Sequence, residues 1–243
     1  NVLELYAEEL INISLDKELK EGNILIGLKQ FLGQNSANAH DNQSLLFKSD
    51  TSLLTLQSSN GINFKSMELK IIWEKVALDE PIVIERYVLG PFSSFESAKK
   101  EANILTKQGY EPTITYPSTW QIWLPSETEI LFKNEFNFKK EVIKYKIVPT
   151  LIDDLEKYQL DGPILVNSEN SININNIDYG KEFYLAKDSY GTWTLIQKLS
   201  FDEYLEGVLP HEIGANSPLE ALKAQAVIAR TWAIYNSDRF NPD

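Results

Sequence analysis

Apolar residues recur along most of this chain in short extended runs that are separated by small polar turns. Residues 23–28 read as a buried strand. Ser58-Ser59-Asn60-Gly61 has the composition of a turn that closes a hairpin. Residues 2–10 mix apolar and acidic positions at near-helical spacing, and residues 33–44 predict a loop. We therefore expect the first eighty residues to be mostly β.

A strand–helix–strand pattern follows. Residues 84–89 predict a strand that Gly90-Pro91 breaks, and Ser93 with Glu96 forms a capping box that begins a helix. Four residues share one face of that helix: Phe95, Ala98, Ala102 and Leu105. Gly109 stands where a left-handed cap is needed before the chain becomes extended again.

This unit resembles half of a sporulation-related (SPOR-like) repeat, a small module that binds peptidoglycan in other proteins. The resemblance is carried by the residues from Tyr87 to Lys100 and by Gln108-Gly109-Tyr110. A plain βαβ packing unit, in which glycine and proline only shape a turn, explains the same residues.

Trp120 and Trp123 follow this unit in the sequence Trp-Gln-Ile-Trp. We interpret them as alternating positions with both indoles on one face of a strand. Two such indoles could stack on sugar rings, and packing within a sheet is the alternative.

The β pattern returns between residues 141 and 197, where turns separate short apolar stretches. The predicted strands are residues 145–148, 164–166, 172–174, 183–186 and 193–196. The turns carry the Asn, Asp and Gly residues that tolerate positive φ.

Two helices are predicted near the end of the chain. Ser200 and Glu203 supply a capping box for the first, which Pro210 should stop. Ser217 and Glu220 form a capping box for the second, with Pro218 at its first position. A stripe of small residues favours a buried central helix over about residues 217–235.

Lys223 and Arg230, seven residues apart, share one face of that second helix. Two cations on an otherwise alanine-rich face could hold an anionic group or a partner carboxylate. A solvated edge of the helix is the alternative interpretation.

Glu212 is expected in the loop between the two helices, flanked by Val208, Leu209 and Ile213. Burial beside these apolar side chains would disfavour the charged form and raise the pKa of the carboxyl group. A carboxylic acid that keeps its proton near neutral pH can protonate the leaving oxygen of a glycosidic bond. A solvated loop glutamate is the alternative.

Composition narrows the class of protein. The 243 residues are 43% hydrophobic, which allows a sizeable core. The net charge of −12, from 23 basic and 35 acidic residues, argues against duplex nucleic acid as a partner. Without cysteine the chain has no disulfide or thiolate ligand, and no apolar run reaches the length of a membrane span.

Residues 199–236 resemble the hallmark segment of the stage II sporulation protein D (SpoIID/LytB) family. The matching residues are Tyr204-Leu205, Gly207-Val208, Glu212-Ile213, Pro218 and Glu220 to Ala233. Characterised members of this family are lytic transglycosylases that cut the MurNAc-GlcNAc bond of peptidoglycan and leave 1,6-anhydro-MurNAc ends.

The resemblance implies roles for several residues. Glu212 matches the catalytic glutamate. The candidate substrate contacts in and near the hallmark are Tyr204, His211, Lys223, Gln225 and Arg230, and a solvent-facing position is the alternative for His211. Trp120 and Trp123 are candidate sugar contacts outside it. No cofactor is expected in this chain, although family members usually carry a zinc site in a segment that follows the hallmark helix. Many relatives also have Met-Pro where this chain has Ile213-Gly214.

The expected fold class is α+β, a β-rich domain with a central buried helix and an inserted βαβ-like module. We expect a β-rich part at residues 1–80, the SPOR-like insertion at 81–126 and the SpoIID-like core at 127–243, which should be cut short at its C-terminal end.

Two functions are compatible with the resemblance. One is a lytic transglycosylase, and the other is a non-catalytic glycan-binding protein that recruits or stimulates a cell-wall amidase. The expected partners are peptidoglycan glycan strands and an amidase, and a purely structural envelope module is a third possibility. The resemblance implies an extracytoplasmic location in the periplasm or cell envelope.

Overall fold

The computed structural model describes residues 18, 20–34, 44–130, 135–188 and 190–235. The chain is α+β and β-rich, as the sequence pattern predicts. It forms two compact units, a smaller one made mainly of Val76–Lys146 and a larger one made of the described residues before and after it. The helical pattern expected at residues 2–10 and most of the loop expected at 33–44 lie outside the described residues.

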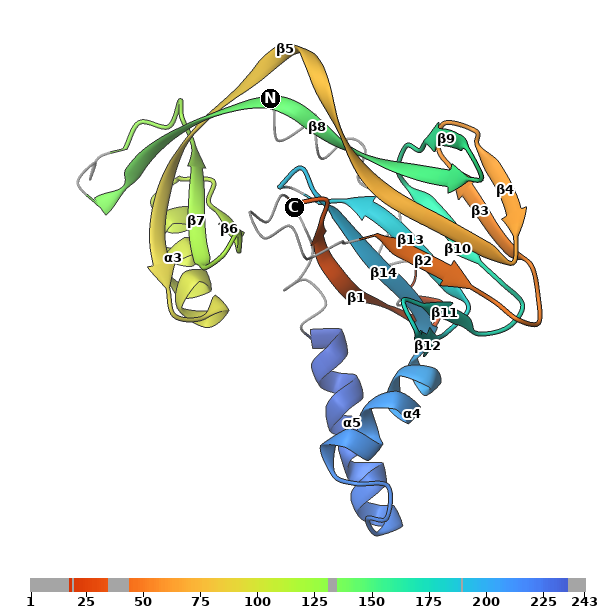
Figure 1. Cartoon of the computed structure of the whole chain (residues 1–243). Helices are drawn as coiled ribbons and strands as arrows, with labels where there is room; N and C mark the ends of the chain where they lie inside the picture. The colour runs from red at the N-terminus through yellow and green to blue at the C-terminus, as the bar shows by residue number, and fades with distance from the viewer. Residues whose placement is uncertain (1–17, 19, 35–43, 131–134, 189, 236–243) are drawn as a thin grey trace. The chain divides into compact units, whose positions relative to one another are not determined.

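One layer of the larger unit is a six-stranded antiparallel sheet in the order β1-β14-β13-β10-β3-β4 (Figure 1). Its strands are β1 (Asn23–Leu32), β3 (Leu54–Ser58), β4 (Asn63–Ser66), β10 (Ile164–Asn167), β13 (Glu182–Lys187) and β14 (Trp193–Ser200). The predicted turn at Ser58–Gly61 is confirmed, because it joins β3 to β4 and Gly61 has a φ of 85°. β1 is less buried than predicted, because an edge strand pairs on one side only.

The second sheet has the order β12-β11-β2-β5-β7-β6, with β8 paired to β5 and β9. Its strands are β2 (Leu45–Lys48), β5 (Glu68–Phe92), β6 (Thr113–Thr115), β7 (Trp120–Pro125), β8 (Asn137–Asp153), β9 (Glu156–Gln159), β11 (Ile172–Ile174) and β12 (Ile177–Tyr179). β5 and β8 are long enough that each contributes residues to both compact units.

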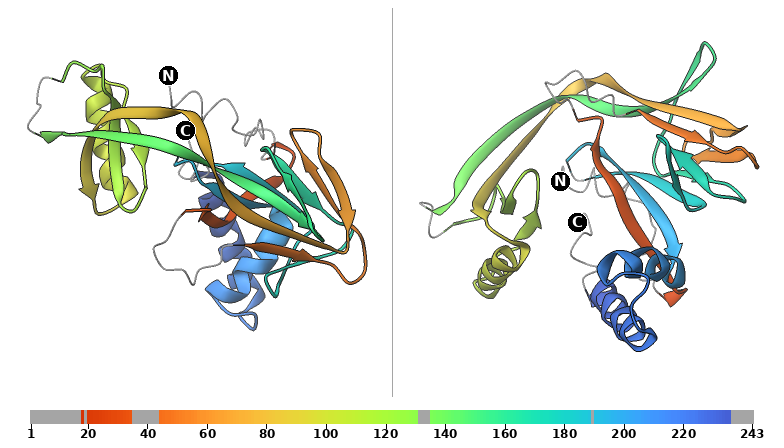
Figure 2. Two further views of the ribbon diagram at one scale, coloured as in Figure 1. Left: turned by 45° about the horizontal axis from the view of Figure 1, so that its top comes forward. Right: turned by 60° about the horizontal axis from the view of Figure 1, so that its bottom comes forward.

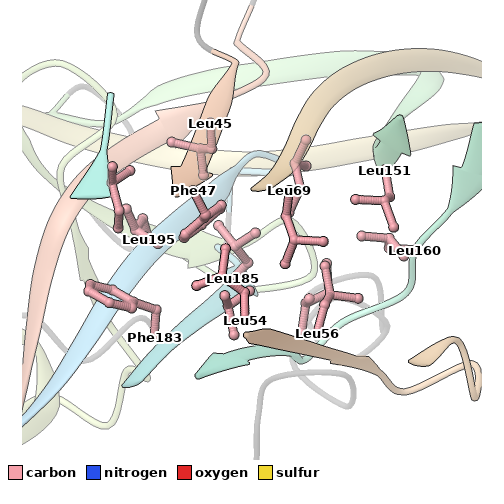
Figure 3. Close-up of a cluster of buried hydrophobic side chains, with 14 of the residues drawn as sticks. Leu45, Phe47, Leu54, Leu56, Leu69, Leu151, Leu160, Phe183, Leu185 and Leu195 are labelled. Atoms are coloured by element: carbon pink, nitrogen blue, oxygen red, sulfur yellow. The ribbon is translucent and has the colours of Figure 1, made fainter. Parts of the chain in front are cut away.

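Apolar side chains from the two sheets meet in one cluster inside the larger unit (Figure 3). β3 and β10 bury every second residue, which is the alternation of a strand with one face on the core. The cluster includes Leu45, Phe47, Leu54, Leu56, Leu69, Leu151, Leu160, Phe183, Leu185 and Leu195. Full burial of each such side chain contributes about 1.5 to 3 kcal/mol, so this cluster dominates the stability of the unit.

The smaller unit contains α3 (Phe95–Lys107), which packs against β6 and β7. Ala98, Ala102 and Leu105 are buried as predicted. The capping box was misplaced by one residue, because Ser94 and Ser97 form it instead of Ser93 and Glu96. The left-handed residue after the helix is Gly109, with a φ of 91°, as predicted.

β5 does not end before Gly90, as the sequence predicted, but continues to Phe92. A register shift against β7 between Leu89 and Phe92 accommodates Gly90-Pro91 within the strand. Gly90 has a φ of 133°, and a Cβ there would lie 3.0 Å from the Trp120 carbonyl oxygen. Only glycine fits this close approach of the two backbones.

α4 (Phe201–Glu212) begins directly after β14, and α5 (Leu219–Tyr235) packs beside it (Figure 2). The helix predicted over 217–235 is present, but its predicted burial is wrong. Only Ala229 and Ala233 are buried, while Val227 and Tyr235 are exposed. Within the described chain, α5 makes its main packing contact with α4, and that contact covers one stripe of small residues.

Candidate functional site

The capping box predicted for the first hallmark helix is confirmed. The backbone N–H of Glu203 donates to Ser200 Oγ at 3.2 Å, and the backbone N–H of Ser200 donates to Glu203 Oε2 at 2.9 Å. The hydrogen bond from the Ser200 backbone is the main reason why the pKa of Glu203 lies below its ordinary value. The start of α4 is therefore fixed where β14 ends.

The base of α4 is also tied to β1. The backbone N–H of Phe201 donates to the Gly22 carbonyl at 3.1 Å, and Phe201 packs with Ile24 and Ala233 in a small buried cluster. This cluster joins α4, α5 and the edge of the first sheet, so the two helices have a defined position within the larger unit.

α4 continues past Pro210, which was expected to stop it. Proline removes one backbone donor in the last turn, but the N–H of Ile213 still bonds to the Leu209 carbonyl at 3.2 Å. Glu212 is therefore the last residue of a helix and not part of a loop.

Glu212 is exposed, so the burial expected beside Val208 and Leu209 is not found. Those two residues are themselves only half-buried. The carboxyl group is thus open to a ligand approaching from solvent.

Tyr204 lies two turns before Glu212 on the same helix and is half-buried. Partial burial raises the pKa of its phenol, and the negative charge of Glu212 raises it further. The hydroxyl therefore keeps its proton at neutral pH and can donate a hydrogen bond. His211, between them in sequence, is exposed.

α5 carries three more of the predicted contacts. Lys223 pairs with Glu220 at 2.9 Å, both side chains being exposed. The Arg230 guanidinium lies over the Phe201 ring at 5.1 Å, and Gln225 is half-buried. The box predicted from Ser217 is replaced by a different contact, because Ser217 Oγ donates to the Ile213 carbonyl at 2.5 Å.

Trp120 and Trp123 lie in the smaller unit and not on the hallmark helices. Our expectation of a shared face was wrong, because residues three apart on a strand point to opposite faces. Trp120 packs against Phe95. Trp123 is 7% exposed, with the Arg86 guanidinium 3.9 Å from its ring centroid, which leaves little ring surface for a sugar.

The structure thus gathers six of the eight predicted site residues on the α4–α5 pair: Tyr204, His211, Glu212, Lys223, Gln225 and Arg230. The sequence did not predict that the Arg230 guanidinium lies over the Phe201 ring. It also did not predict that the Arg86 guanidinium lies over the Trp123 ring. The spacing between these partners along the chain gives no signal for either contact. Within the described residues, His, Asp and Glu side chains form no cluster of three suited to a metal ion.

Comparison with known families matches residues 189–243 to the SpoIID family model, described as stage II sporulation protein. The match covers β14, α4 and α5 and includes every predicted contact on the two helices. It supports the SpoIID resemblance of this segment, whereas a sporulation-related repeat is not shown.

An uncharacterized protein of Brachyspira hyodysenteriae (strain ATCC 49526 / WA1) is 38% identical to this chain over 74 residues. The aligned part is 30% of this chain and 20% of the relative, so the chain spans about a fifth of that protein. No solved structure matches the chain significantly. No helix in the described ranges has the length and apolar character to cross a membrane.

Proposed function

We propose that this chain acts outside the cytoplasm on the glycan strands of the bacterial cell wall, as a peptidoglycan lytic transglycosylase with Glu212 as its acid and base. The observation that carries the proposal is the SpoIID match over residues 189–243, which includes Glu212 at the exposed end of α4. Tyr204, on the same helix, adds a protonated hydroxyl within electrostatic reach of that carboxyl group.

The proposed reaction needs one carboxyl group. The Glu212 acid protonates the glycosidic oxygen as the bond from MurNAc C1 to that oxygen breaks. The resulting carboxylate then accepts the proton of the MurNAc C6 hydroxyl while the C6 oxygen forms a bond to C1. The products are a free GlcNAc hydroxyl and a 1,6-anhydro-MurNAc end, and Glu212 regains its proton without consuming water.

A second candidate is a glycan-binding protein that recruits or stimulates a cell-wall amidase. The exposure of Glu212 favours it, because acid–base catalysis usually takes place in a site from which water is excluded. On this proposal the α4–α5 pair holds glycan without cutting it.

Mass spectrometry of products released from peptide-stripped and intact wall glycan tests the first candidate. We expect anhydro-muramic products from the natural chain and a loss of at least about a hundredfold for Glu212→Gln, in line with removal of an acid–base catalyst. Asp202→Asn, an exposed acid in the first turn of α4, is the matched control and should retain activity.

Undiminished release by Glu212→Gln would overturn the mechanism. If no variant releases products while glycan still co-sediments with the chain, the second candidate is favoured. Its own measurement is the rate of a cell-wall amidase with and without this chain.

A further inference from the structure

The turn between β3 and β4 contains an asparagine followed directly by a glycine, Asn60-Gly61. The backbone N–H of Gly61 donates to the Ser58 carbonyl at 3.0 Å, and the N–H of Ser58 donates to the Ile62 carbonyl at 2.9 Å. Gly61 has a φ of 85°, so the turn ends in a left-handed residue. Asn60 and Gly61 are both exposed, and water and base therefore reach them.

Hydrogen bonds anchor this turn to the end of β9 and to the residues after it (Figure 1). The side-chain Nδ2 of Asn60 donates to the Gln159 carbonyl at 2.9 Å. Ser58 Oγ accepts from the Asp161 N–H at 2.9 Å. The hydroxyl proton of Ser58 serves either the Asp161 carbonyl at 2.6 Å or Asn60 Oδ1 at 2.7 Å. The Asn60 amide is thus held by a carbonyl 99 positions further along the chain.

An asparagine followed by glycine can lose its side-chain amide without an enzyme. The Gly61 nitrogen gives its proton to base and attacks Cγ of Asn60, and the bond from Cγ to Nδ2 breaks with release of ammonia. Water then opens the cyclic imide at either carbonyl, which leaves aspartate or isoaspartate. Glycine favours the attack because it has no Cβ to shield its nitrogen.

The native turn opposes this reaction in two ways. The Gly61 N–H is already donated to the Ser58 carbonyl, which shields its proton from base. The Asn60 amide is fixed on Gln159, so Cγ turns toward the glycine nitrogen only after a hydrogen bond has broken. Deamidation is therefore limited to chains in which the turn has opened.

We propose that Asn60 is a site of spontaneous deamidation that the anchored β3–β4 turn protects in the native chain. The inference is independent of the glycan chemistry proposed above. Conversion to aspartate removes the donor to the Gln159 carbonyl and places a carboxylate oxygen against it. Isoaspartate also adds a methylene group to the backbone of the turn. A modified chain is therefore unable to restore the anchor, and the modification records that the turn has opened.

Peptide mass spectrometry of the full chain, incubated at mildly alkaline pH with and without guanidinium chloride, tests the inference. We expect deamidation of Asn60 in guanidinium and a rate at least about tenfold lower in the native chain, because the open turn is sparsely populated. Gly61→Ala should slow the reaction in guanidinium, where the strain of alanine at positive φ has no effect.

Two variants test the anchor itself. Ser58→Ala should speed deamidation of the native chain by about fivefold or more and leave the rate in guanidinium unchanged. Ser59→Ala removes only a hydroxyl that donates to the Gly162 carbonyl at 2.6 Å, and it should also speed the native reaction. Ser126→Ala, in the smaller unit, is the matched control and should keep the native rate.

Three results would overturn the inference. The absence of deamidation at Asn60 in guanidinium would show that this residue is not a reactive site. Equal rates with and without guanidinium would show that the native turn gives no protection. An unchanged native rate in Ser59→Ala and in any folded Ser58→Ala would show that the anchor is not its source. Far-UV circular dichroism establishes whether each variant is folded.

Discussion

At the scale of single residues, Asp188 is the clearest structural carboxylate of the larger unit. It is 6% exposed and accepts hydrogen bonds from the Tyr190 N–H at 3.0 Å, the Thr192 N–H at 2.9 Å and the Thr192 hydroxyl at 2.5 Å. Burial raises its pKa, and the hydrogen bonds act in the opposite direction. These contacts shape the turn that leads into β14.

We expect Asp188→Ala to lower the free energy of unfolding by about 2 to 3 kcal/mol, because it leaves buried N–H groups without an acceptor. Urea denaturation measures the change. Asp178→Ala is the control, since Asp178 accepts one exposed hydrogen bond from Asn173, and its cost should be below about 1 kcal/mol. Equal losses for the two variants would contradict the structural role of Asp188.

Residue chemistry was the least predictable part of the candidate site from sequence. The acid–base role expected for Glu212 came from a family resemblance. Its exposure follows from its position as the last residue of α4, whereas Pro210 led us to expect that the helix ends earlier. The error for Trp120 and Trp123 was different in kind. The strand was present, but their spacing of three was read as if it were even.

At the scale of elements, Glu74 on β5 connects to β8 and β9. It accepts a hydrogen bond from Lys157 at 2.6 Å and another from Thr150 at 3.1 Å. The hydrogen bond from Lys157 lowers the pKa of Glu74 below its ordinary value of 4.5, burial acts against this, and Thr150 lowers it further. The contact therefore stabilises the folded chain when the carboxyl group is ionised.

The folded-state pKa is the lower one, so this stabilisation is present above the unfolded-state pKa and is lost as the pH falls through the folded-state value. We expect Lys157→Met to cost about 0.5 to 1 kcal/mol at pH 7 and progressively less as the pH falls below 4.5. Urea unfolding of both proteins across this pH range provides the measurement. A difference that stays constant with pH would show that the Lys157 stem, and not its charge, supplies the stability.

Elements were predicted well where a local signal was sufficient. The alternation of apolar and polar positions at residues 164–166 and 193–196 predicted the strands β10 and β14. Ser200 with Glu203 predicted the start of α4. Burial of α5 could not be predicted in the same way. Its small-residue stripe marks a contact face, but the coverage of the other faces depends on partners distant in sequence.

At the scale of the whole molecule, the two compact units differ in the size of their cores. Among the described residues, the smaller one has a buried cluster of Ala98, Ala102, Leu105 and Ile122, whereas the larger one has seventeen buried apolar residues in one cluster. Because burial of apolar area is the main stabilising term, the smaller unit should open at a lower free energy.

We expect Ile122→Ala to destabilise the smaller unit by about 2 to 5 kcal/mol through the cavity it leaves. Hydrogen exchange followed by mass spectrometry should show faster exchange in α3 and β7 with unchanged protection of β13 and β14. Leu185→Ala, in the large cluster, should give the reverse pattern. Uniform loss of protection for either variant would mean that the chain unfolds as a single cooperative unit.

The attachment of α4 to β1 also determines when the helix can form. β1 pairs with β14, and Gly22 bonds to Phe201, so the anchor of α4 joins segments nearly 180 residues apart in the chain. During synthesis the ribosome must complete almost all of the described chain before these strands can pair. The α4–α5 pair is therefore one of the last features of the described chain to acquire its native position.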